Sequence, residues 1–215
     1  GAGRGRRAGP RQCARAAEGR ACGTRVVLAV EVWQGAGWIV QDHRTFTWFE
    51  GPQPAETWRA GGWLTKLGAL HDGKITPLGE ELAALPVHPR IARLLVEGRR
   101  LGGAEETALL AAMLSQRDPF FRNAGPQRRS ASHTSRSDVL DRLHALQDFE
   151  NRGLADTPFG SINRQGAKQI FKVREQLLSL TERANRKRNS SEVHISPDDA
   201  AMQSLLSAYP DRVAR

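Results

Sequence analysis

Arginine and lysine clusters are the residues of this sequence best placed to do chemistry, and that chemistry is electrostatic contact with phosphate. The 215 residues hold 32 Lys and Arg against 23 Asp and Glu, a formal net charge of +9. Residues 1–25 carry seven arginines and one acid, Glu18, so this segment has a net charge of +6. Cationic side chains bind phosphate oxygens and release counterions from a polyanion. Such clustering predicts a nucleic-acid partner, although charge by itself also fits a merely basic soluble protein.

Two further basic clusters lie in the second half of the sequence. Four arginines occur between residues 122 and 136 with no acid among them, and three Arg and one Lys fall between residues 183 and 188. Phosphate contacts hold a nucleic acid without reading its bases, so the expected partner is RNA or DNA. The residues that we predict to contact it are Arg93, Arg117, Arg122, Arg128, Arg129, Arg136, Lys168 and Lys172.

No residue set predicts catalysis or metal binding. The six histidines are scattered and no two of them stand four residues apart, which favours surface or capping roles over a metal site. Asp198 and Asp199 are typical of a helix start, and the serines of 130–137 have no base placed beside them. The sequence contains no Gly-x-x-x-x-Gly-Lys-(Ser/Thr) loop to cradle phosphates and no Asp-Glu-Ala-His run to hold Mg²⁺. We therefore expect no catalytic residue, no cofactor in this chain and no ATP hydrolysis by the chain alone.

Cysteine usage and hydropathy predict the compartment. Cys13 and Cys22 form neither a metal-ligand spacing nor a disulfide framework, which favours a reducing, cytoplasmic setting. No signal peptide and no apolar run of membrane-spanning length are visible, so no membrane partner is expected. Because the chain begins with Gly instead of Met, we expect a processed, truncated or incomplete product.

The elements that position these residues are predicted to be mainly α-helical. An apolar helix face is expected from Trp58, Trp63, Leu64, Leu67 and Leu70, and Asp72-Gly73 then predicts a tight hairpin. Helix, short turn and helix follow in the order of a winged-helix domain with a minimal wing. Residues 1–25 are low in complexity, and we expect a disordered basic tail there.

A rigid corner is predicted between residues 76 and 95. Thr76 can cap a helix through its hydroxyl, and Pro77 fits the first helical position, where its missing N–H costs nothing. Pro86 ends that helix and Pro89 opens the next. The second helix is expected to bury Ile91, Leu94 and Leu95. A corner that fixes the angle between two helices suits a junction between small domains.

Further helices are predicted by 3–4 spacing of apolar residues. One runs from Gly103 to about Gln116 with Leu109, Leu110, Met113 and Leu114 on its face, and others cover residues 139–149, 170–184 and the stretch after Ser196-Pro197. We interpret residues 120–137 as a basic loop. Phe120 and Phe121, beside Arg122, could stack bases, but packing is the better interpretation for Phe120. The expected fold is a small winged-helix domain followed by a helical bundle.

Four segments carry a family resemblance. Thr76–Leu95 closely resembles the junction between the winged helix and the helical "ratchet" domain of DEAH-box RNA helicases, including both prolines, Thr76 and Gly79. Leu109–Phe120 resembles the run that ends in Arg-Asp-Pro-Phe in that ratchet. Asp42–Glu50 and Ala208–Arg215 are similar to segments of HrpB-type bacterial members. The resemblance is continuous from about residue 42 to the end of the chain.

The resemblance implies a domain organisation. Residues 1–25 would be a tail with a remnant of helicase motif VI, residues 26–88 a winged-helix domain, residues 89–195 the ratchet, and residues 196–215 the start of a truncated C-terminal domain. Arg4 and Arg7 match the motif arginines that reach the ATP γ-phosphate in the family. Gly5 and Arg6 depart from the motif, and a Gly/Ala/Arg-rich tail with chance matches is the competing interpretation.

The resemblance also implies a function. The chain would be a fragment of an HrpB-like ATP-dependent RNA helicase that binds single-stranded nucleic acid. The intact family uses ATP and Mg²⁺ in motor lobes, and those lobes are missing partners of this chain. The alternative is a non-catalytic protein-interaction module, or a non-functional relic of a split or frameshifted helicase gene.

Overall fold

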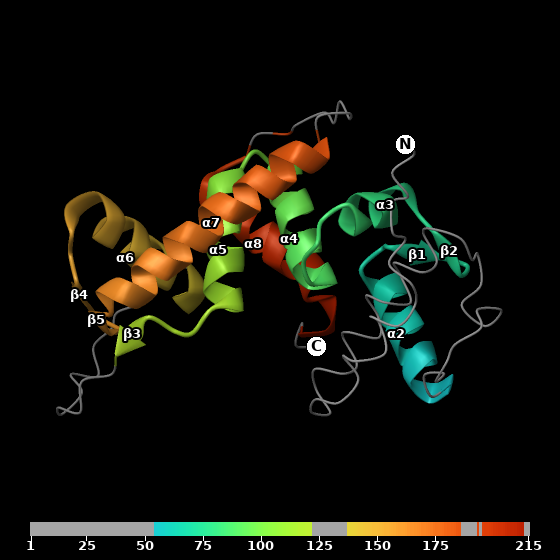
Figure 1. Cartoon of the computed structure of the whole chain (residues 1–215), viewed down its shortest axis with the longest axis horizontal. Coiled ribbons are helices and arrows are strands. Elements are labelled where there is room, and N and C mark those ends of the chain that lie inside the picture. Colours follow the sequence, from blue (N-terminus) through green and yellow to red (C-terminus); the bar gives the residue numbers. More distant parts are fainter. Residues whose placement is uncertain (1–53, 122–136, 186–192, 194, 213–215) are drawn as a thin grey trace, which may run out of the picture. The chain divides into compact units, whose positions relative to one another are not determined.

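The computed structural model describes residues 54–121, 137–185, 193 and 195–212, which are mainly helical (Figure 1). The chain divides after Ala92 into two compact units. The described part of the first contains α2 (Pro54–Lys66), β1 (Leu70–His71), β2 (Lys74–Ile75), α3 (Pro77–Ala83) and the start of α4 (Pro89–Arg100). The second holds the rest of α4, then α5 (Ala104–Ser115), β3 (Phe120–Phe121), α6 (Asp138–Arg152), β4 (Asp156–Thr157), β5 (Gly160–Ile162), α7 (Arg164–Asn185), α8 (Pro197–Ala208) and the 3₁₀ turn η3 (Pro210–Arg212).

The predicted hairpin of the winged-helix unit is confirmed. Strands β1 and β2 pair antiparallel, with His71 opposite Lys74, around a two-residue turn. Both turn residues have positive φ, 50° at Asp72 and 75° at Gly73, as a type I′ turn requires. The Asp72-Gly73 pair therefore forms the tight turn that the sequence predicts.

Two residues assigned to the first helix face were placed wrongly. Helix α2 ends at Lys66, and Gly68, with a φ of 75°, forms the turn that follows it. Around it the Gly68 amide donates to the Thr65 carbonyl at 2.9 Å, and the Ala69 amide donates to the Leu64 carbonyl at 2.9 Å. This Schellman motif terminates the helix, so Leu70 lies in β1 instead. Trp58 is 81% exposed and is not part of the inner face.

Thr76 caps α3 as predicted and also joins it to the end of α2. The Gly79 amide donates to Thr76 Oγ1 at 2.9 Å, while Thr76 Oγ1 donates to the Gly68 carbonyl at 2.6 Å. Pro77 occupies the first turn of the helix. The Thr76 hydroxyl therefore caps the start of α3 and also bonds a carbonyl of the turn that follows α2. These two hydrogen bonds fix the distance between the end of α2 and the start of α3.

The corner between α3 and α4 follows the two prolines. Helix α3 ends at Ala83, Pro89 opens α4, and the predicted inner face of Ile91, Leu94 and Leu95 is buried. His88 caps α4: its Nδ1 accepts the Arg90 amide at 3.1 Å, and its carbonyl accepts the Ala92 amide at 2.9 Å. Trp63 meets the His88 ring edge-on at 5.8 Å between centroids, and the Arg90 guanidinium lies 4.4 Å from the Trp63 centroid.

This cap makes the stability of the winged-helix unit depend on pH. Burial, and next the charge of Arg90, lower the pKa of His88 below its ordinary value of about 6.5. The unfolded chain therefore binds a proton more readily, so stability is full above about pH 7 and declines as pH falls through about 6.5 towards the folded pKa. Protonation at Nδ1 removes the acceptor for the Arg90 amide, and we expect a loss of about 1 kcal/mol by pH 5.

Urea unfolding followed by tryptophan fluorescence checks this pH dependence. His88→Asn keeps a cap acceptor without a titrating ring, so its unfolding midpoint should change less between pH 7.5 and pH 5 than that of the parent chain. Equal pH dependence in the two proteins would contradict the assignment to His88.

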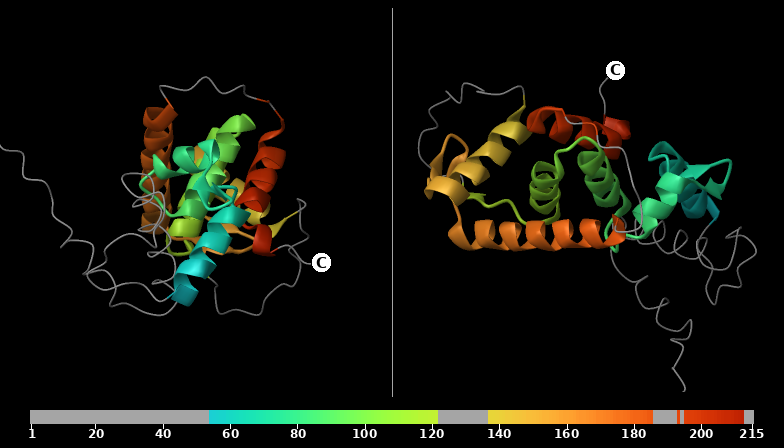
Figure 2. Two further views of the ribbon diagram at one scale, coloured as in Figure 1. Left: turned by 90° about the vertical axis from the view of Figure 1, so that its right-hand side faces the viewer. Right: turned by 90° about the horizontal axis from the view of Figure 1, so that it is seen from above.

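Helix α5 is the centre of the second unit. Its residues Thr107 to Ala112 are buried all round, and it packs against α7, α8 and α6. The right-hand view of Figure 2 shows α5 between α7 on one side and α8 on the other. The apolar face predicted for this helix is wrong for one residue, because Leu114 is 46% exposed. Alanines at 108, 111 and 112 let neighbouring helices approach from several sides, and Leu114 lies beyond them.

A three-stranded antiparallel sheet, in the order β3-β5-β4, was not predicted. Phe120 pairs with Ile162 and Phe121 with Ser161, while Asp156 pairs with Ser161 from the other side. The predicted basic loop at 120–137 therefore begins with strand β3 instead of irregular backbone. Its last residue, Ser137, caps α6, because Ser137 Oγ accepts the Val139 amide at 3.3 Å. Residues 122–136 lie outside the described part.

The remaining helix predictions are confirmed. Helix α6 ends at Gly153, which has a φ of 72°, and α8 begins at Ser196, whose Oγ accepts the Asp199 amide at 3.2 Å. His144 Nε2 lies 2.8 Å from Asp198 Oδ1, which ties α6 to the start of α8. Within the described ranges, we find no helix of sufficient length and apolarity to cross a bilayer.

Candidate nucleic-acid interface

Helix α7 is the scaffold of the candidate interface. Asn163 begins it: its Oδ1 accepts the Gln165 amide at 2.9 Å and the Gly166 amide at 3.3 Å. One face of α7 is buried at positions that recur every three to four residues, and α5 covers it. The buried residues are Ala167, Ile170, Leu177 and Thr181. The predicted apolar stripe is therefore core, and the opposite face is left to solvent.

Arg174 fixes α7 to α6. Its guanidinium donates to both carboxylate oxygens of Glu150, at 2.6 and 2.8 Å, and also to Glu175 at 2.8 Å. These hydrogen bonds, that to Glu150 first, raise the pKa of Arg174. The rings of Phe149 and Phe171 stack beside this bridge with centroids 6.4 Å apart. Arg174 therefore acts as a structural cation, and it leaves the exposed face to its neighbours.

Lys168 and Lys172 lie on that exposed face. They are four residues apart on α7, so their side chains are neighbours on the helix surface, and both are exposed. Arg164 extends the same row by one turn and is also exposed. Glu175 follows, but Arg174 binds its carboxylate, which reduces its repulsion of an anion. The arrangement is a row of three cations along one helix.

Arg164 was missed by the sequence reasoning. It stands four residues before Lys168, so the two side chains are neighbours on one helix. This spacing indicates Arg164 only when the helix includes residue 164, as α7 does. The apolar residues of this helix begin at Ile170 and do not indicate where the helix starts, whereas Asn163 is the residue that caps it.

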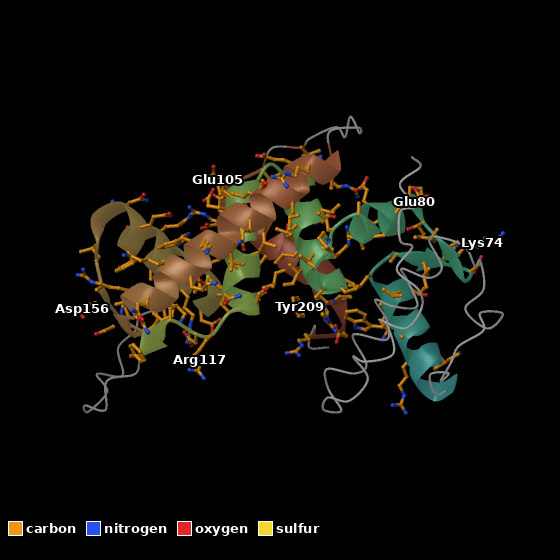
Figure 3. The ribbon with its side chains drawn as sticks, in the orientation of Figure 1. Lys74, Glu80, Glu105, Arg117, Asp156 and Tyr209 are labelled. Atoms are coloured by element: carbon orange, nitrogen blue, oxygen red, sulfur yellow. The ribbon has the colours of Figure 1, made fainter. Side chains whose placement is uncertain are left out.

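Arg117 lies on a different part of the second unit. It is exposed in the segment between α5 and β3, and Figure 3 shows its side chain directed away from the helices. Pro119, two residues on, packs against Gly166 on the first turn of α7. Positions 166 and 168, occupied by Gly166 and Lys168, lie about 160° apart around the axis of α7. The structure therefore does not place Arg117 on the same face as the lysine row.

Asp118 and Arg142 hold this segment in place. Asp118 Oδ1 accepts the Phe120 amide at 3.0 Å, and Asp118 Oδ2 accepts Arg142 Nη1 at 2.9 Å. The Arg142 guanidinium carbon lies 5.3 Å from the centroid of Phe120, a ring that is buried. The packing interpretation of Phe120 is therefore confirmed, and Phe121 is the exposed member of the pair, at 57%.

The other predicted contact residues are dispersed. Arg93 is half-buried on α4 and its Nη1 lies 2.6 Å from Glu97 Oε2, so its charge is already paired. Arg122, Arg128, Arg129 and Arg136 lie outside the described residues, and so do Arg4 and Arg7 of the predicted motif remnant. The roles of all these arginines stay predictions. In the described part of the chain, no group of three His, Cys, Asp or Glu side chains could hold a metal ion.

Comparison with known proteins identifies both units. Residues 88–196, just over half of the chain, match the family described as "Helicase associated domain (HA2), ratchet-like". Residues 64–87 match "Helicase associated domain (HA2), winged-helix". The matched ranges contain α7, its row of cations and the capped corner at Thr76.

Curated relatives and a solved structure agree with this result. The chain is 40% identical to the mouse (Mus musculus) "Probable ATP-dependent RNA helicase DHX34" over 101 residues, 46% of this chain and 9% of that protein. It is 27% identical to the "ATP-dependent RNA helicase HrpA" of Escherichia coli (strain K12) over 164 residues, 70% of this chain and 13% of that protein. The fold matches the crystal structure of the E. coli DExH-box NTPase HrpB with a TM-score of 0.53 and 22% identity, covering 87% of this chain and 18% of HrpB.

These figures also show how small a part of each relative is matched, since the chain spans about a tenth of the length of the two curated relatives. The fold class predicted from the sequence, a winged helix followed by a ratchet-like bundle, is confirmed. The chain therefore belongs to the helicase-associated (HA2) domain family of the DEAH-box RNA helicases.

Proposed function

We propose that this chain is the accessory region of an ATP-dependent RNA helicase and that it binds a single strand through phosphate contacts. The observation that carries the proposal is the row of Arg164, Lys168 and Lys172 on the exposed face of α7, a helix whose other face is buried. Cations at successive turns match the repeating charge of a backbone and need no base readout. The relatives named as RNA helicases make RNA the first strand to test.

In this proposal, ATP and Mg²⁺ bind to motor lobes that act together with the chain. The 215 residues contain neither a P-loop nor an Asp-Glu-Ala-His run, so the chain's own part is to hold the strand. We propose an HrpB-like parent, because Asp42–Glu50 and Ala208–Arg215 resemble segments of that type. A cytoplasmic setting belongs to the same proposal and is supported by the absence of a disulfide framework around Cys13 and Cys22.

The test is the salt dependence of RNA binding. For a single strand, the slope of log affinity against log salt changes by about 0.7 for each phosphate contact. The double variant Lys168→Gln, Lys172→Gln should therefore flatten the slope by about 1.4 and bind at least about tenfold more weakly at 50 mM salt. Fluorescence anisotropy with a labelled single-stranded RNA of about 12 nucleotides measures both quantities.

The matched control removes the same charge elsewhere. Lys66 and Lys74 are exposed lysines of the winged-helix unit, so Lys66→Gln, Lys74→Gln lowers the net charge equally (Figure 3 labels Lys74). An equal loss of affinity in both double variants would show that only net charge matters and would overturn the assignment to α7. Absence of binding by the parent chain at low salt would favour the alternative, a protein-interaction module.

A further inference from the structure

Phe121 is a large apolar side chain that the fold holds in solvent. It is 57% exposed, although its neighbour Phe120 is 8% exposed and packs edge-on against Phe159 at 6.0 Å between centroids. Successive residues of a strand point to opposite faces, so burying Phe120 directs Phe121 outward. An exposed apolar residue standing singly is common, so exposure alone assigns no role to it.

The backbone around Phe121 is held rigidly. Its strand pairs with β5, with Phe121 opposite Ser161, and the preceding residues are bonded through Asp118 to the Phe120 amide and to Arg142. The residue directly across the ladder is Ser161, whose side chain is small. A rigidly presented aromatic face loses little conformational entropy when a planar group covers it.

An exposed cation lies near Phe121 in sequence. Arg117, four residues before it, is exposed. The sheet face that carries Phe121 is different: Ser161 Oγ donates to Asp156 Oδ1 at 3.0 Å on that face. A carboxylate repels phosphate but accepts hydrogen bonds from the amino groups of bases. Arg117 thus suits the backbone of a strand, and the sheet face suits its bases.

We propose that Phe121 stacks a base of a bound single strand, as a contact separate from the phosphate row on α7. This inference rests on the proposed nucleic-acid function, and it adds a residue that acts on bases. Ring–base stacking is sequence-tolerant, because every base presents a π-face. The strand would therefore meet two kinds of contact, cations on α7 and a ring on β3.

The experiment compares strands with and without bases. Phe121→Ala should weaken binding of a 12-nucleotide RNA by about tenfold without changing the salt slope, because stacking releases no counterions. Phe121→Trp should bind at least as well as the parent chain. An abasic strand of equal length should bind the parent chain and Phe121→Ala equally. Leu154→Ala is the matched control, since Leu154 is a 51% exposed apolar residue in the same unit.

Several results would overturn the inference. The first is an unchanged RNA affinity in Phe121→Ala, and the second is an equal loss of affinity for the abasic strand. The third is a lowered thermal midpoint of Phe121→Ala that accounts for its loss of RNA affinity, which would show that the ring is covered within the fold. Failure of the proposed function is separate, because it appears as an unchanged salt slope in the Lys168, Lys172 double variant. If the parent chain binds no strand, an NMR titration with millimolar adenosine monophosphate still decides: ring-proton shifts at Phe121 support stacking, and their absence refutes it.

Discussion

Alanine at position 98 should destabilise the ratchet unit by about 3 kcal/mol, although alanine normally stabilises a helix interior relative to glycine. A methyl group built on Gly98 of α4 overlaps the Oγ1, Cγ2 and Cβ atoms of Thr107 on α5. Thr107 is fully buried, and its Oγ1 donates to the Gly103 carbonyl at 2.7 Å, so its side chain cannot rotate away without losing that bond. The two helices must instead move apart, which opens the core around α5.

Thermal unfolding by far-UV circular dichroism measures the effect of Gly98→Ala, and we expect a fall in the midpoint of roughly 10 °C. Adding Thr107→Ala to Gly98→Ala should restore part of the loss, because it removes the clashing atoms. Gly62→Ala is the control, since a methyl at Gly62 meets nothing within 4 Å, and it should be neutral or slightly stabilising. A midpoint for Gly98→Ala equal to that of the parent chain would contradict the close approach of α4 and α5.

Gly79→Ala should destabilise the winged-helix unit by a similar amount, about 2–3 kcal/mol. A methyl group at Gly79 overlaps the carbonyl oxygen of Ala69 and lies 2.8 Å from Ile75 Cγ1. The first obstacle is backbone, and it is fixed because the Thr76 amide donates to the same Ala69 carbonyl at 3.0 Å. No truncation of a neighbouring side chain relieves such a clash, so Ile75→Ala, which removes the Cγ1 atom, should fail to rescue Gly79→Ala.

Tryptophan fluorescence is the matched measurement for Gly79→Ala, because all five tryptophans precede residue 64 and so belong to the first unit. The urea midpoint should fall in Gly79→Ala and stay unchanged or rise in Gly61→Ala, whose added methyl group meets nothing within 4 Å. A rescue of Gly79→Ala by Ile75→Ala would show that the side chain, and not the Ala69 carbonyl, limits the space.

Local signals explain what could be predicted from the sequence. The Asp72-Gly73 turn, the Thr76 cap and the Gly153 helix end each depend on a few neighbouring residues, and the structure confirms them. In the β3-β5-β4 sheet, β3 pairs with residues of β5 about forty positions away, β4 and β5 pair residues three to five positions apart, and each strand has only two or three residues. Such strands are too short to show a period of two, so no local pattern indicates them.

The candidate site was predictable in part for the same reason. Lys168 and Lys172 were named from the sequence, and their common face follows from helical spacing. The pairing of Arg93 with Glu97 four residues later was readable from that spacing too, but it was not considered. That Arg117 and the lysine row lie on different sides of α7 depends on the contact of Pro119 with Gly166, which is a tertiary fact that no local pattern indicates.

The sheet that closes this segment has a consequence for the length that the segment can have. Phe120 pairs with Ile162, the Asn163 amide donates to the Pro119 carbonyl at 2.8 Å, and Ser137 caps α6 through its own side chain. Both ends of the stretch from 122 to 136 are therefore anchored by residues outside it. Because loop-closure entropy grows only with the logarithm of length, doubling this stretch would cost about 0.6 kcal/mol. Insertions there would therefore leave the packing of the bundle nearly unchanged.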